Sequence, residues 1–182
     1  DYTITAGSTG DYAVITNGEN ASLVIDAKVA SLGGGLAADN GAKIEFNGQG
    51  VDISKYIKSS PARYNIYASR GGEIVINSGT FKFNSTNNTR RAYVCVENGG
   101  KVIINGGEFA NAGEGSDLIY AKNGGQVEIY GGVFKACPKG ANVEGTAQTY
   151  SALNLHDNTK NNSITVYGGT FYNFDPANNK SE

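Results

Sequence analysis

The chain has 182 residues, and its charges nearly balance, with 15 Lys and Arg against 17 Asp and Glu and a formal net charge of −2. Because no basic cluster stands out, the composition argues against a nucleic-acid-binding groove. No apolar run approaches the roughly 20 residues of a membrane-spanning helix, which argues against membrane insertion. The length predicts one domain over residues 1–182, and the absence of Met predicts a module excised from a longer chain.

The first strand-like units in the chain are short and weakly marked. Leu23 is followed two residues later by Ile25, and Ile44 is followed at the same distance by Phe46. Apolar side chains at i and i+2 are typical of a β-strand with one buried face. We therefore expect a short strand at each of these positions.

One phrase then occurs four times further along the chain. It contains two apolar residues spaced by two and a phenylalanine seven positions after the first of them. The copies are GGEIVINSGTF (71–81), GGKVIINGGEF (99–109), GGQVEIYGGVF (124–134) and NNSITVYGGTF (161–171). Gly and Asn between the short strands favour sharp turns. Repetition at intervals of tens of residues predicts a solenoid whose units stack on one another.

A third apolar position precedes each unit, eight residues upstream in five units and eleven in the last. It is occupied by Ile15, Leu36, Ile66, Val94, Ile119 and Leu153. We therefore predict an all-β fold, a single-stranded parallel β-helix of about six coils with three short strands per coil. Its interior is expected to contain one ladder of Ile44, Ile74, Val102, Val127 and Ile164 and another of Phe81, Phe109, Phe134 and Phe171.

The repeated phrase and the segments before it, among them LIYAKNGG (118–125) and VCVENGG (94–100), resemble the pectin-lyase-like family over nearly the whole chain. This resemblance implies a right-handed parallel β-helix and says little about activity, because unrelated functions share the fold. The segment GGTFYNFDPANN (168–179) is similar to the closing motif of β-helix modules in phage virion proteins, such as head fibres, and in surface proteins of gut bacteria. The second resemblance implies an extracellular module, on a virion exterior or a bacterial cell surface.

Members of this family that cleave acidic polysaccharides use clustered carboxylates. The register places Glu45 and Glu128 on the outer face three coils apart, about 14 Å at the usual strand spacing, which is too far for a glycosidase pair. His156 beside Asp157 could act as a base and its orienting group, although a lone histidine in a surface turn is the commoner case. We predict no catalytic residues, no metal site and no cofactor.

Apolar side chains gather on the outside of the predicted stack. With strict alternation, the outward residues that form one patch are Tyr67, Tyr93, Leu118 and Tyr120. Three alternatives stay open: a loop such as 136–150 covers the patch, the patch is an oligomer contact in a trimer, or its rings stack on a sugar. Val75 and Ile103 form a second outward patch, to which the first two alternatives apply.

The two cysteines form neither a metal-binding cluster nor a CxxC redox motif. Cys95 is expected to point outward from a strand, and Cys137 is expected to open a long loop. A disulfide between them stays open beside the simpler alternative of two free thiols.

These patterns favour a non-enzymatic structural or adhesive module of an exterior assembly, such as a phage virion fibre or appendage protein. Its expected partners are further copies of itself in a homo-oligomer, with a trimer favoured, and a host-surface glycan. The alternative is a carbohydrate-binding or polysaccharide-cleaving β-helix of a bacterial surface or secreted protein. In that case Tyr67, Tyr93 and Tyr120 would line its groove.

Overall fold

The computed structural model describes residues 2–5, 12–26, 29–33, 35–48, 51–52, 64–83, 91–111, 116–136, 152–156 and 161–178. Within these ranges the regular structure consists of β-strands and one short 3₁₀ helix, η1 (Pro176–Asn178). The predicted all-β fold is confirmed for this part of the chain. Cys137, Asp157 and, apart from Ala136, the loop at 136–150 lie outside the described residues.

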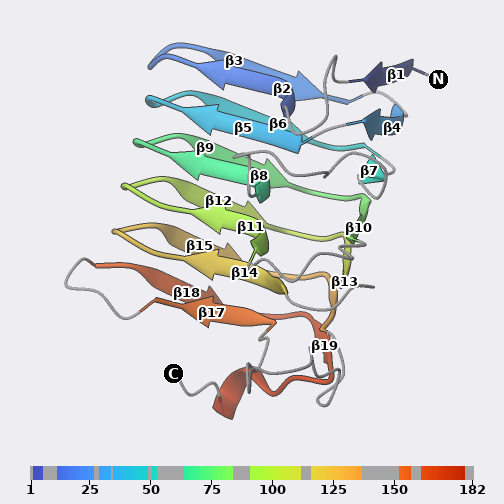
Figure 1. The fold of residues 1–182 in the computed structure, drawn as a ribbon, viewed down its shortest axis with the longest axis vertical. Helices are drawn as coiled ribbons and strands as arrows, with labels where there is room; N and C mark the ends of the chain where they lie inside the picture. Colours follow the sequence, from blue (N-terminus) through green and yellow to red (C-terminus); the bar gives the residue numbers. More distant parts are fainter. Residues whose placement is uncertain are drawn as a thin grey trace.

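The strands pair in parallel, and each strand's partners lie three positions earlier or later in chain order (Figure 1). The first sheet contains β2 (Tyr12–Asn17), β5 (Gly35–Asp39), β8 (Tyr64–Ser69), β11 (Arg91–Val96), β14 (Ser116–Ala121) and β17 (Leu153–Leu155). The second sheet contains β3 (Ser22–Ile25), β6 (Lys43–Phe46), β9 (Glu73–Ile76), β12 (Lys101–Ile104), β15 (Gln126–Ile129) and β18 (Ser163–Val166). The third sheet contains β7 (Val51–Asp52), β10 (Thr80–Phe83), β13 (Glu108–Asn111), β16 (Val133–Lys135) and β19 (Thr170–Tyr172), while β1 (Tyr2–Thr5) and β4 (Val29–Gly33) form a separate pair.

The two predicted core ladders are in register inside the stack. The aliphatic ladder crosses the second sheet, and its fully buried members are Ile44, Ile74, Val102 and Val127. The aromatic ladder crosses the third sheet, and its rings stack with centroid distances of 4.8, 5.2 and 4.7 Å between Phe81, Phe109, Phe134 and Phe171. Ile164 and Phe171 are only partly buried because they lie on β18 and β19, the last strands of their sheets.

Tight turns join β5, β8, β11 and β14 to the strands of the second sheet that follow them. In the turn after β11, Asn98 and Gly99 have φ values of 52° and 77°, and the N–H of Gly100 donates to the carbonyl of Glu97 at 2.9 Å. Asn and Gly tolerate this left-handed conformation. A Cβ at Gly100 would lie 2.4 Å from the carbonyl oxygen of Ala68, and Cβ atoms at Gly72 and Gly125 would come at least as close to carbonyl oxygens, so the second glycine of these turns permits close backbone approach.

Strict alternation fails in the first sheet, and two predictions are corrected there. The pairing of β11 with β14 passes from Ala92–Asp117 to Val94–Ile119, and both Tyr93 and Val94 are fully buried. Two consecutive side chains therefore face the interior, where the Tyr93 ring meets Phe81 and Phe109 edge-on at 6.3 and 6.5 Å. The predicted exposure of Tyr93 is wrong for this reason, and so is that of Leu118, which belongs to the core cluster with 1% exposure.

A similar shift displaces the first predicted core residue of the sheet. The pairing of β2 with β5 changes register between Tyr12 and Val14, so that Val14 faces Leu36. Val14 is 8% exposed and lies in the core, whereas Ile15 is 63% exposed. The bulge therefore replaces Ile15, the predicted core residue, with its neighbour.

Candidate functional site

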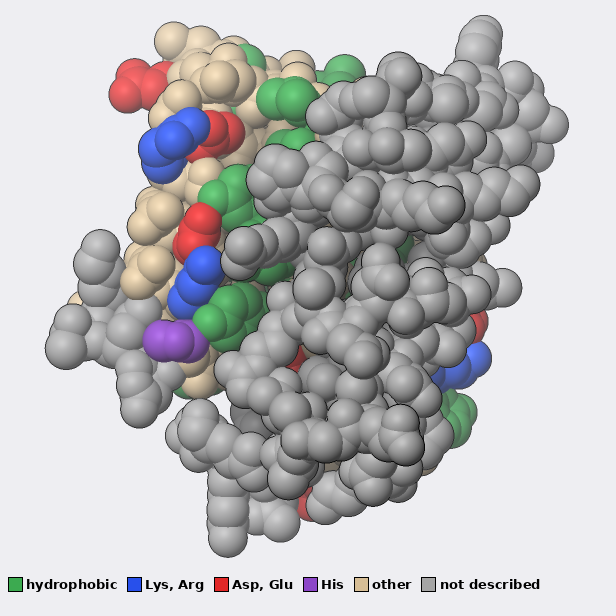
Figure 2. All heavy atoms as spheres, viewed as in Figure 1, with side chains coloured by type: hydrophobic (Ala, Val, Ile, Leu, Met, Phe, Trp, Pro, Cys, Tyr) green, Lys and Arg blue, Asp and Glu red, His purple; other side chains and the backbone are tan. Residues whose placement is uncertain are grey.

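Four tyrosines and one lysine gather on the outer face of the first sheet, and we call them the tyrosine face: Tyr12, Tyr64, Tyr67, Tyr120 and Lys122. The Tyr67 ring stacks on those of Tyr12 and Tyr64 at 6.2 and 5.7 Å. The ammonium group of Lys122 lies 5.7 Å from the ring centroids of both Tyr64 and Tyr120, which is cation–π distance. Figure 2 shows charged side chains of both signs beside hydrophobic ones along one side of the molecule, with the histidine among them.

Sequence reasoning located part of this face. Tyr67 and Tyr120 lie on it, one on each side of Cys95 in the strand register, and both side chains are partly exposed. Tyr93 and Leu118, predicted to lie between them, are in the core instead. Tyr64 was missed because strict alternation places it inside the stack. The paired apolar residues 93–94 and 118–119 were the available signal that alternation breaks there.

Glu97 links Tyr67 to Lys122 within the tyrosine face. The Tyr67 hydroxyl donates to the Glu97 carboxylate, and Lys122 forms an ion pair with the same carboxylate at 2.8 Å. Burial raises the pKa of Glu97, but hydrogen bonds from Lys122 and Tyr67 outweigh it, so the pKa lies below its ordinary value. Burial and the bond to Glu97 raise the pKa of Tyr67 to about 12. At neutral pH the face therefore presents neutral phenols, one carboxylate and one ammonium.

Cys95 lies on the outward side of β11 and is fully buried as a free thiol. Burial raises its pKa to about 12, so the group is a neutral thiol at neutral pH. A thiol in this state is a poor nucleophile. Cys95 therefore contributes packing rather than chemistry to the tyrosine face.

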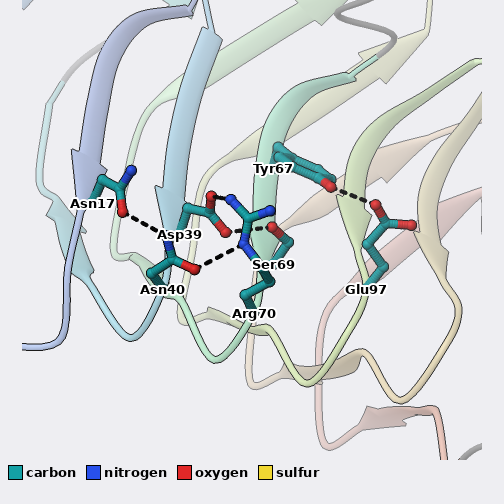
Figure 3. A network of polar contacts seen from close by, with 7 residues as sticks. All are labelled: Asn17, Asp39, Asn40, Tyr67, Ser69, Arg70 and Glu97. Carbon is teal, nitrogen blue, oxygen red and sulfur yellow. Dashed lines mark hydrogen bonds and ion pairs between the residues drawn. The ribbon is translucent and has the colours of Figure 1, made fainter.

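Polar contacts continue from this face along the turns at its edge (Figure 3). Ser69 donates to Asp39 at 2.7 Å, and Asn40 donates to Asn17 at 2.8 Å. Arg70 donates to Asn40 at 2.8 Å and forms an ion pair with Asp39. These contacts join β2, β5 and β8 at the same end of the first sheet, and they hold successive turns in line.

Ion pairs elsewhere follow the same rule. Five ion pairs between described residues each join neighbouring levels of one sheet: Arg70–Asp39, Lys43–Glu73, Lys101–Glu128, Lys122–Glu97 and Lys135–Glu108. Partly exposed pairs of this kind contribute about 0–1 kcal/mol each. Their function in this fold is to align strands rather than to form a charged cleft.

The carboxylates considered for catalysis do not meet. Glu45 and Glu128 occupy one outward column of the second sheet with Val75 and Ile103 between them, as the sequence register predicted. His156 is exposed, and its ring lies edge-on to that of Tyr120 with 5.8 Å between the ring centroids. Within the described ranges there is no group of three His, Cys, Asp or Glu side chains that could hold a metal ion.

The second sheet carries a further row of aligned side chains on its outer face. Val75 and Ile103, the second outward patch, are register partners and half-buried. Beside them the amide of Asn77 donates to Asn47 at 2.7 Å, and the amide of Asn105 donates to Asn77 at 2.6 Å. This face is therefore ordered by ladders of like side chains.

Comparison with known proteins finds no matching family model, no matching curated protein and no matching solved structure. Among the described residues, no helix has the length and apolar character to cross a membrane.

Proposed function

We propose that this chain is a right-handed parallel β-helix of six coils that serves as a non-enzymatic structural module in an exterior assembly, on a virion or a bacterial surface. The observation that carries the proposal is the passage of consecutive strands from β5 onward, in turn, through three parallel sheets. In such a stack each coil buries its apolar side against its neighbours. The phage and bacterial-surface motif at 168–179 supports the exterior location.

The contacts of the stack fit a rigid scaffold. The phenylalanine ladder continues through four successive strands of the third sheet, and the ion pairs and amide ladders join neighbouring levels. Bending the stack would separate these contacts on one side, so the arrangement resists deformation. A stiff module displayed outside a particle or cell needs this property.

Oligomerisation is part of this proposal and has a direct test. Virion and surface modules of this kind are expected to assemble as trimers, packed side by side. Light scattering on the purified chain should then show a smallest assembly of three times the 19.0 kDa chain mass. A single species of chain mass at every concentration would contradict the trimer.

A second candidate, carbohydrate binding, is favoured by the tyrosine face. Partly exposed phenol rings beside a carboxylate and an ammonium offer ring faces, donors and acceptors to a sugar. Glycan-array binding should be lost in Tyr120→Ala and kept in Tyr172→Ala, which removes an exposed tyrosine of the third sheet. The absence of any bound glycan for the wild type would remove this candidate, and turnover of a polysaccharide would contradict the non-enzymatic proposal.

A further inference from the structure

Exposed apolar side chains concentrate at the two ends of the stack. Those found among the described residues are Ile15, Leu23, Val24, Tyr130, Val166, Tyr167 and Tyr172. The first three lie on β2 and β3, and the others lie on or directly after β15, β18 and β19. Among the residues of the central strands whose burial is described, none of comparable size is exposed.

The inward columns of the second sheet show why the ends differ. Leu23 is 38% exposed, although its register partner Ile44 is fully buried. At the other end Val166 is 36% exposed, although its partner Ile129 is fully buried. Each exposed residue and its buried partner are both apolar and both point inward. They differ in that β3 and β18 have a neighbouring strand on one side only. Leu23 and Val166 therefore present part of the interior at the two ends, whereas Ile25, the other inward residue of β3, is 7% exposed.

The end strands also lack the charges that protect sheet edges. Natural edge strands commonly carry Lys or other charges that prevent pairing with another chain. Here β1, β2, β3, β17, β18 and β19 contain no charged residue, whereas every strand between them except β4 and β8 contains at least one. The edge strands of the first and second sheets are therefore uncharged and open to pairing, whereas β7, an edge strand of the third sheet, contains Asp52.

We propose that the two ends bind each other, so that copies of this chain associate head to tail. In this arrangement β18 of one copy pairs in parallel with β3 of the next, in the register used throughout the second sheet. The residues then brought together are Ser163 with Ser22, Ile164 with Leu23, Thr165 with Val24 and Val166 with Ile25. Inward pairs are apolar with apolar, and outward pairs are hydroxyl with hydroxyl or two β-branched residues of similar size.

A second copy fits these edges because its β3, paired with β18, continues the parallel arrangement found throughout the second sheet. The exposed edge of β18 continues the stack on one side, and that of β3 continues it on the other (Figure 1). The third sheet is closed differently, since Phe174 packs on Phe171 at 6.3 Å beneath β19. A contact between unlike ends is heterologous and grows as an open series rather than closing into a dimer.

Sedimentation velocity of the purified chain over a wide concentration range tests the proposal. The wild type should show species that grow with concentration in steps of one assembling unit, without a fixed final size. The variant V24K/T165K places two like charges opposite each other and should weaken association roughly tenfold or more. The variant V24K/T165E places opposite charges there and should associate far better than the double lysine variant.

Val75→Lys is the matched control, because it adds a lysine in the same outward column on an inner strand. It should leave head-to-tail growth unchanged. The lysine variants should retain any side-by-side trimer, which separates this proposal from the oligomer proposed above.

A wild type that does not grow with concentration overturns the inference. So does growth of V24K/T165K equal to that of the wild type, or equal weakness of both double variants. Thr165→Lys alone replaces the double variants if they do not fold, and undiminished growth of this variant overturns the inference too.

Discussion

Removal of one ring from the middle of the phenylalanine ladder should cost far more than removal of the ring at its end. Phe109 is fully buried, stacks on Phe81 and Phe134 at 4.8 and 5.2 Å, and meets Tyr93 edge-on. Truncation of a buried Phe to Ala costs about 3–5 kcal/mol, and each aromatic pair contributes about 0.5–1.5 kcal/mol beyond area burial. We therefore expect Phe109→Ala to lower the free energy of unfolding by about 4–5 kcal/mol, a large share of the typical total of about 5–15 kcal/mol.

Phe171→Ala is the matched control in the same ladder. Phe171 is partly buried and stacks closely on one ladder ring only, Phe134 at 4.7 Å, so we expect about half the cost. Urea unfolding followed by circular dichroism measures both variants against the wild type. Equal losses for the two variants would refute the nearest-neighbour account of the stack. A loss below about 1 kcal/mol for Phe109→Ala would refute its assignment to a close-packed core.

The remaining predictions concern the two faces of a strand, a carboxylate and a thiol. Ile104→Asp buries an unpaired charge and should abolish the cooperative thermal transition seen by circular dichroism, whereas Ile103→Asp, one position outward, should remain folded. The lowered pKa of Glu97 means that its ionised form stabilises the fold above the ordinary carboxyl pKa, and this contribution is lost as pH falls through the lowered value. Urea unfolding should therefore show Glu97→Gln less stable than the wild type at pH 7, with the difference shrinking at pH 3; a constant difference would contradict this assignment. In a Cys137→Ser background, the buried thiol of Cys95 should react with a thiol reagent at neutral pH only after unfolding, so rapid labelling of the folded protein would contradict its burial.

The core ladders could be predicted from the sequence because stacking imposes one spacing on every unit. Ile74 and Phe81 are seven residues apart, and Val102 and Phe109 repeat that distance, since equivalent residues of neighbouring strands must lie above one another. A change of spacing would move a side chain from the interior to the outside. Because the strands pair in parallel, residues at the same offset in successive units lie in one column of the sheet.

The tyrosine face could be predicted only in part because a local bend of the strands is not written in the residue spacing. Tyr93 lies in the core because two consecutive residues of β11 face inward, and the same bend turns Tyr64 outward beside Tyr67. Alternation alone assigns both of them to the wrong side. Tyr67 and Glu97 are 30 residues apart in the sequence, and only the fold brings them within hydrogen-bond distance.

The absence of charge on the end strands was also present in the sequence, but its meaning depends on topology. Segments such as SLVI (22–25) and SITV (163–166) look like ordinary short strands. Their position at the two edges of the second sheet turns the lack of Lys and Glu into a feature of the surface. Sequence gives the composition of an edge, and only the arrangement of strands identifies which segments are edges.

The stacking of strands is the central claim, and pulsed electron paramagnetic resonance on pairs of spin labels tests it most directly. Labels at the outward positions Val24 and Thr165 are separated by five strand spacings, and labels at Val24 and Glu128 by four. With the native cysteines replaced and labelled protein diluted into unlabelled protein, we predict distances of about 24 Å and about 19 Å, a step of one strand spacing. Equal distances for the two pairs, or a shorter distance for the pair at Val24 and Thr165, would contradict the stack.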